Sequence, residues 1–276
     1  MKKNLNIIQL LRTEKERIFH VADKREILDA MIEHIGAIEE EVRDRLIYET
    51  FVEWISYDVL TDEDMHYLFT EILRLELLTT SLGEEKSQDV FLRSYASLLM
   101  ATLLAKDQQV SFLTKEEVTP LLQKVGFLLA RENDTRGFVD SFGSAHAIAH
   151  FADLNMIAIY HPHYNMQDAA KSLQAITSAC WKGNVYRDDE DERLTRVIIA
   201  LVERGISEEM LIEWVEQTAE RLDFYVQRNG YDPLYLTSRT MTMQLFKTLY
   251  FSLKMRYLCP NVQNILYAEI SKRLAV

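Results

Sequence analysis

The sequence has few of the residues that build turns. Among 276 residues there are eight glycines and four prolines, too few for the many tight turns of a multi-stranded sheet. Alternating apolar and polar runs, which mark half-buried strands, are too short to be convincing anywhere. Leu, Ile, Glu, Arg and Ala dominate instead, and these residues favour helix. The composition therefore predicts an all-α protein with under about a tenth of its residues in strands.

Cysteine is scarce, and long apolar runs are missing. Cys180 and Cys259 are far apart and form neither a CxxC pair nor a zinc-ligand spacing. Cys180 lies in an apolar helical context, so we expect a small core residue there, not a reactive thiol. No apolar run approaches the roughly 20 residues of a membrane span, and the N-terminus lacks the apolar core of a signal peptide. These absences predict a cytoplasmic protein in a reducing compartment, with no membrane partner.

Clustered positive charge is also missing. The net charge is −12, and Lys and Arg are scattered among Asp and Glu as on solvated helix faces. A nucleic-acid partner is therefore not expected, because phosphate binding needs a concentrated basic surface. No stretch rich in Pro, Gly or Ser marks a linker, so we expect one domain over residues 1–276. Residues 1–20 would be a first helix or a projecting arm.

Apolar residues recur at helical spacing through most of the chain. Thr61 with Asp64, and Thr114 with Glu117, are capping-box pairs that predict helix starts. About a dozen helices with short connections predict antiparallel neighbours. Successive helix pairs of roughly 40 residues recur by length, as in HEAT and armadillo repeats. The predicted architecture is therefore an α-α superhelix of antiparallel helix pairs, and a compact bundle of the same helices is the alternative.

One stretch, residues 131–160, joins turn-forming residues to an unusually apolar helix. A helix is predicted over about 143–160, and His146, His150 and Asp153 fall on one stripe of it at i, i+4 and i+7. Almost every other position on this helix is apolar, and such a helix is usually central in its domain. We therefore expect it to be the most buried helix, with other helices on at least two sides.

The polar stripe has two interpretations. Histidines at i and i+4 can bind one divalent metal ion, and Asp153 would add a carboxylate. However, Ala147 follows His146, so the glutamate base of the HExxH metalloproteases is missing, and a third ligand would come from elsewhere. Alternatively, the side chains form hydrogen bonds between packed helices, with His146 in the first turn if Ser144 is the N-cap. We expect partial exposure of the stripe toward a concave surface.

Arg136 and Asp140 precede this helix. Arg136 is a candidate to hold an anion at the N-terminal amides of the helix. In the structural interpretation, Gly137 supplies a turn, Asp140 or Ser141 caps the helix, and Arg136 pairs with a nearby acid. The candidate ligand-binding residues are Arg136, Asp140, His146, His150 and Asp153; those for a metal are His146, His150 and Asp153.

Several short motifs follow one another in a characteristic order. They are RDRL at 43–46, YET at 48–50, VFLRS at 90–94, DTRGFV at 134–139, AHAIAH at 145–150, ADL at 152–154 and DEDERL at 189–194. This order resembles a bacterial family of uncharacterised all-helical proteins, a domain of unknown function. That family usually has Trp before the AHA run, where this chain has Ser144. The resemblance implies an α-α superhelical fold and supplies no catalytic residues.

Two functions are compatible with these features. The leading hypothesis is a non-enzymatic module that binds a protein or peptide on an extended concave surface, with basic or apolar partners preferred by an acidic chain. The alternative is a metal-dependent or small-molecule enzyme with its site around His146, His150 and Asp153. No Gly-rich phosphate loop, Ser-His-Asp order or Cys-His pair indicates a specific reaction. The oligomeric state stays open.

Overall fold

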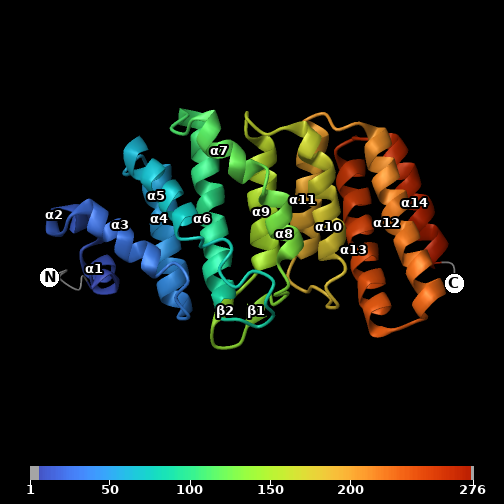
Figure 1. The fold of residues 1–276 in the computed structure, drawn as a ribbon, viewed down its shortest axis with the longest axis horizontal. Helices are drawn as coiled ribbons and strands as arrows, with labels where there is room; N and C mark the ends of the chain where they lie inside the picture. Colours follow the sequence, from blue (N-terminus) through green and yellow to red (C-terminus); the bar gives the residue numbers. More distant parts are fainter. Residues whose placement is uncertain (1–5, 275–276) are drawn as a thin grey trace.

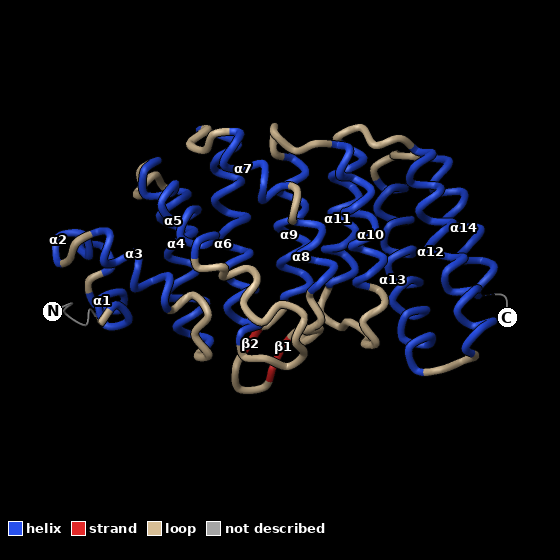
Figure 2. Tube along the Cα trace, viewed as in Figure 1, coloured by secondary structure: helices blue, strands red, loops and turns tan. Residues whose placement is uncertain are grey.

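The computed structural model describes residues 6–274 and consists mainly of helices (Figure 2). They are stacked along the longest axis, with the N-terminus at one end and the C-terminus at the other, and neighbours such as α8 and α9 or α10 and α11 change places along it (Figure 1). The helices are α1 (Ile7–Thr13), α2 (Ile18–Val21), α3 (Lys24–Glu33), α4 (Glu49–Ser56), α5 (Asp62–Arg74), α6 (Asp89–Val110), α7 (Lys115–Leu122), α8 (Val125–Arg131), α9 (Ala147–Tyr160), α10 (Ala169–Ala179), α11 (Glu190–Glu203), α12 (Glu208–Asn229), α13 (Pro233–Met255) and α14 (Pro260–Leu274). Shorter helical segments are η1 (Lys15–Arg17), the π-helical η2 (Glu41–Tyr48) and η3 (Met166–Asp168).

Strands make up four of the described residues. β1 (Phe138–Val139) pairs antiparallel with β2 (Gly143–Ser144), with Phe138 opposite Ser144. The prediction of an all-α chain with under a tenth of its residues in strands is therefore confirmed. Among the residues described, no helix is both long enough and apolar enough to cross a membrane.

Local capping chemistry sets several helix starts. The Thr61 hydroxyl accepts from the Asp64 amide, and the Asp64 carboxylate accepts in return from the Thr61 amide at 2.9 Å. Thr114 and Glu117 form the same reciprocal pair at the start of α7. Each pair gives partners to amides that the first helical turn leaves unbonded. Both predicted capping boxes are confirmed.

The N-terminal segment packs as a helix. Ile7 and Leu11 of α1 are buried, and α1 contacts α3 and η2. Residues Ile7–Thr13 of the predicted helix or arm over 1–20 therefore form a packed helix, while residues 1–5 lie outside the described range. Buried apolar side chains from Ile7 to Leu266 form one connected cluster. Cys180 is a buried member of this cluster, as predicted.

α9 lies in the middle of the stack (Figure 1). It packs against α6, α7, α8 and α11, and ten of its 14 residues are buried, the largest share of any described helix. Small residues such as Ala149 and Ala152 let the neighbouring helices approach closely. The prediction of a central, most buried helix is confirmed, but its predicted start was wrong. The helix begins at Ala147, because residues 143–144 belong to β2.

Candidate functional site

His146 is the residue at which the hairpin becomes helix α9. Its backbone has a φ of 45°, in the left-handed region, and its amide donates to the Arg136 carbonyl at 3.1 Å. The neighbouring Ala145 amide donates to the Gly137 carbonyl at 2.8 Å. Ser144 lies in β2 and is not the N-cap, so the condition for placing His146 in the first turn is not met, and His146 is itself the N-cap residue. The hairpin, and not a side-chain cap, fixes how His146 enters the site.

His150 is held by a buried hydroxyl on α6. The Ser94 Oγ donates to the Ala145 carbonyl and lies 2.6 Å from His150 Nδ1. Because a hydroxyl has one proton, Nδ1 must carry the proton that it shares with Ser94. Nε2 is therefore left as an acceptor, and no partner for it is found among residues 6–274. Burial, followed by the positive charges of His146 and Arg193, lowers the pKa of His150 to about 3.

The Ser94–His150 pair cannot act as a nucleophile and its base. The separation is that of a catalytic pair, but Ser94 is fully buried and its proton is committed to the Ala145 carbonyl. The nitrogen that faces Ser94 is also the protonated one, which cannot accept a further proton. Ser94 therefore serves to position the His150 ring, which also meets Tyr95 edge-on at 5.6 Å between centroids.

Asp153 has a cationic partner that lies 40 residues further along the chain. Arg193 Nη1 on α11 is 2.6 Å from the Asp153 carboxylate, and Arg193 Nε is 3.3 Å from Asp189. Burial raises the pKa of Asp153, and the nearby arginines oppose this shift. The Asp153 side chain is 12% exposed and that of Arg193 is 31% exposed, so the pair lies at the edge of the core.

Asp188 joins the hairpin to this cluster. Its Oδ2 accepts from the Phe138 amide at 3.2 Å and lies 3.9 Å from His146 Nε2. A Cβ at Gly137 would fall 1.9 Å from Asp188 Oδ2, so glycine leaves room for the carboxylate. The sequence predicted Gly137 as a turn residue. The structure adds a second reason for glycine at this position, which is close approach by a side chain.

Arg136 and Asp140 lie outside the cluster. Arg136 holds Asp134 through Nε at 2.8 Å and Nη2 at 2.5 Å, and also donates to the Ser87 carbonyl. The structural alternative for Arg136, pairing with a nearby acid, therefore describes its contacts. Asp140 is exposed in the turn between β1 and β2. Its predicted capping role was wrong, because α9 begins seven residues later.

The match to a family model covers residues 78–251, and its description reads "Protein of unknown function (DUF2785)". The chain belongs to this family. The matched region begins before α6 and extends into α13, so it contains the whole His146–His150–Asp153 cluster and its partners. No curated protein and no solved structure matches the chain.

This DUF2785 chain thus brings together three of the five candidate residues. The centroids of the His146 and His150 rings are 6.0 Å apart. The positive charge of Arg193 acts on both His150 and Asp153, and it favours a lower pKa for each. Within the described residues, no group of three or more His, Cys, Asp or Glu side chains is placed to hold a metal ion. His161 follows the C-terminal end of α9, and its Nε2 lies 2.9 Å from Asp107 Oδ2, away from His146 and His150.

Three members of the cluster were not predicted from the sequence, namely Ser94, Asp188 and Arg193. Each lies about 40 residues or more from its partner, so periodicity on α9 gives no indication of it. Two of them do lie within motifs on which the family resemblance was based, VFLRS at 90–94 and DEDERL at 189–194. Those motifs were the available signal.

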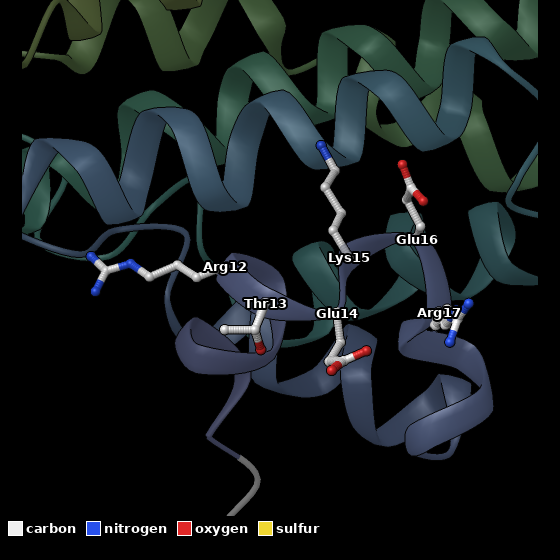
Figure 3. Close-up of a pocket in the computed structure, with 6 residues that line it drawn as sticks. All are labelled: Arg12, Thr13, Glu14, Lys15, Glu16 and Arg17. Atoms are coloured by element: carbon white, nitrogen blue, oxygen red, sulfur yellow. The ribbon is translucent and has the colours of Figure 1, made fainter.

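A hollow of about 460 Å³ lies elsewhere, where α1 leads into η1. Arg12 and Lys15 at its edge pair with Glu41 and Glu53 across the N-terminal helices. The side chains around it point in different directions and do not converge on a common point (Figure 3). This surface therefore does not have the form of a binding site.

Proposed function

We propose that the chain is a protein- or peptide-binding module with an α-α superhelical, HEAT- or armadillo-like arrangement of helix pairs. The order of the helices supports this, because elements close in sequence lie beside one another along the stack (Figure 1). α11 packs on α13, and α12, α13 and α14 pack on one another. Stacks of this type present long surfaces that suit extended partners. The connected core also supports a single domain over residues 1–276, and we keep the cytoplasmic location predicted from the sequence.

The observation that carries this proposal is a group of exposed apolar side chains at the C-terminal end. The ring of Tyr250 contacts those of Phe251 and Tyr267, at 5.3 and 6.3 Å between centroids. Phe251 and Tyr267 are 59% and 63% exposed, and Met255, one turn after Phe251, is 78% exposed. Single exposed apolar residues are ordinary, but a contiguous group on a surface marks an interaction site.

Peptide selection tests the proposal. The full chain, immobilised through one terminus, would be used to select from a random peptide library displayed on phage. We expect enriched sequences that bind again as free synthetic peptides, with dissociation constants near the micromolar range of short-peptide recognition. Selection that enriches nothing, or only peptides that bind the support alone, would contradict the proposal.

A second candidate function is a metal-dependent or small-molecule enzyme with its site at His146, His150 and Asp153. The acceptor nitrogen of His150, next to His146 on a partly exposed surface, is the observation that favours it. Elemental analysis of protein purified without a histidine tag tests this candidate. It requires one ion per chain, lost in His146→Ala and His150→Ala and kept in the control His66→Ala, whose ring pairs with Glu117 elsewhere. Metal-free protein would exclude the metal-dependent form.

A further inference from the structure

A groove lies between α11 and α13, next to the exposed aromatic side chains. Its volume is about 360 Å³, which falls within the lower part of the range of about 300–1,000 Å³ for ligand sites. Thr195 and Ile199 on α11 are buried at its base, whereas Phe251 and Met255 on α13 are exposed at its edge. The groove therefore combines a closed base with an apolar rim that faces solvent.

The base of the groove has an unsatisfied polar atom. Thr195 is 2% exposed, and its Oγ1 forms no hydrogen bond with any described residue. A buried hydroxyl without a partner costs about 1–3 kcal/mol of stability. Thr195 Oγ1 is closed off from solvent, so it forms part of the buried base of the groove and the rim provides the contact surface.

The charge around the groove is opposite to that of the whole chain. The net charge of the chain is −12, yet three cations and one carboxylate line this groove. Arg196 and Lys247 are exposed and form no ion pair among residues 6–274, whereas Arg256 pairs with Glu203 at 3.2 Å. Within this range Lys247 has no carboxylate partner, and Arg196 acts on Asp153 only over a longer distance, so both cations are open to an acidic ligand at this surface.

The length of the groove limits what it can hold. Its lining runs from Glu192 to Ile199 on α11, and from Lys247 on α13 to Arg256, the residue that follows this helix. At about 1.5 Å per helical residue, these stretches are about 10–14 Å long. An extended chain rises about 3.3 Å per residue, so roughly four residues fit. One apolar side chain can then reach the rim while acidic residues on either side meet Arg196 and Lys247.

We propose that the groove between α11 and α13 binds a short acidic peptide segment through one apolar anchor side chain. This inference rests on the proposed function and specifies its partner: an acidic segment at this surface, and not the basic one that net charge alone favours. In this proposal Arg196 and Lys247 attract the acidic residues of the segment, and Phe251 and Met255 contact its apolar anchor side chain.

The probe is a fluorescein-labelled peptide, Gly-Glu-Glu-Phe-Glu-Glu-Gly, titrated with the full chain and followed by fluorescence anisotropy. We expect saturable binding that weakens as salt is raised, because exposed charges are screened. A peptide with Lys in place of each Glu, and one with Ala in place of Phe, should each bind at least about tenfold more weakly. Equal binding of the Lys peptide would overturn the inference.

Matched variants place the peptide on the protein. Lys247→Glu should weaken binding by about tenfold or more, whereas Lys254→Glu, the same change on an exposed residue of α13 outside the lining, should change it less than about twofold. Phe251→Ala should weaken binding, and Phe224→Ala, at a side chain of similar exposure on α12, should not. Circular dichroism would confirm that all four variants are folded.

The outcomes separate this inference from the proposed function. If library-selected peptides bind the Lys247→Glu and Phe251→Ala variants as tightly as the wild type, the groove is not their binding site. The proposal that the chain is a binding module would still stand. Failure of the acidic peptide to bind would overturn the inference regardless of the library result. Displacement of the peptide by vesicles of anionic phospholipid, but not by unlabelled peptide, would assign the cations to a membrane surface and overturn it too.

Discussion

Acidification should destabilise this protein through His150. The native pKa of His150 is about 3, lowered by burial and by the positive charges of His146 and Arg193, while an unfolded histidine titrates near 6.5. A group with a depressed native pKa contributes stability that is complete above the unfolded pKa and is lost as pH falls toward the native pKa. The relevant window is therefore about pH 6.5 down to about pH 3.

The size of the effect follows from proton binding. Within this window the unfolded chain holds nearly one more proton at His150 than the native chain does, which gives about 1.4 kcal/mol per pH unit. Between about pH 7.5 and pH 4.5 the loss would be about 2–3 kcal/mol. Because the His150 ring keeps partial access to water, we expect a value in the lower half of this range.

Urea unfolding at several pH values measures this loss, with His150→Asn as the comparison. The asparagine amide can still donate to Ser94, but it does not titrate. Other groups also contribute to the pH dependence. The pKa of Glu117 is lowered to about 2, so the stability that this carboxylate contributes is lost as the pH falls. The pKa of Asp153 is raised, so its effect on stability has the opposite sign. Subtracting the variant from the wild type removes these contributions.

The expected result is a shallower pH dependence in His150→Asn than in the wild type. Equal slopes between about pH 6.5 and pH 4.5 would show that the native state protonates His150 as easily as the unfolded chain does. The assigned tautomer and the Ser94 contact would then be incorrect.

Three further changes test the packing around the site. Glu132→Ala should cost about 3–5 kcal/mol in urea unfolding, because it leaves Arg93, which is fully buried, without its carboxylate; a loss below about 1 kcal/mol would contradict this. Ala152→Leu should overpack the core around α9 and lower the stability of the protein by about 1–3 kcal/mol. An unchanged melting temperature would count against close packing there. Gly137→Ala should also be destabilising, because its Cβ meets Asp188. The same change in an Asp188→Ala background should cost less than about 0.5 kcal/mol, and equal costs in both backgrounds would disprove the clash.

The sequence predicted those features that short segments determine. The capping boxes at Thr61 and Thr114 involve residues three apart, and each chain segment contains everything that its cap requires. The burial of α9 in the centre of the stack likewise follows from the apolar composition of the helix itself. These features therefore did not depend on knowing the tertiary structure.

The start of α9 and the contacts of its stripe depend on distant residues. The left-handed backbone of His146 is held by hydrogen bonds to the chain before the hairpin, and not by a capping side chain. Ser94 is 56 residues from His150, and Arg193 is 40 residues from Asp153. No spacing rule within one helix links such pairs. Only the packing of α6 and α11 on α9 brings them together.

Hydrogen exchange with and without a library-selected peptide tests the central claim, that this chain binds a protein or peptide segment, most directly. At saturating peptide, we expect slower amide exchange confined to adjoining segments of α11 and α13, with the rest of the stack unchanged. Protection on another continuous face of the helices would keep the binding module and move its site. Exchange that is identical with and without peptide throughout residues 6–274, despite saturation, would contradict the account.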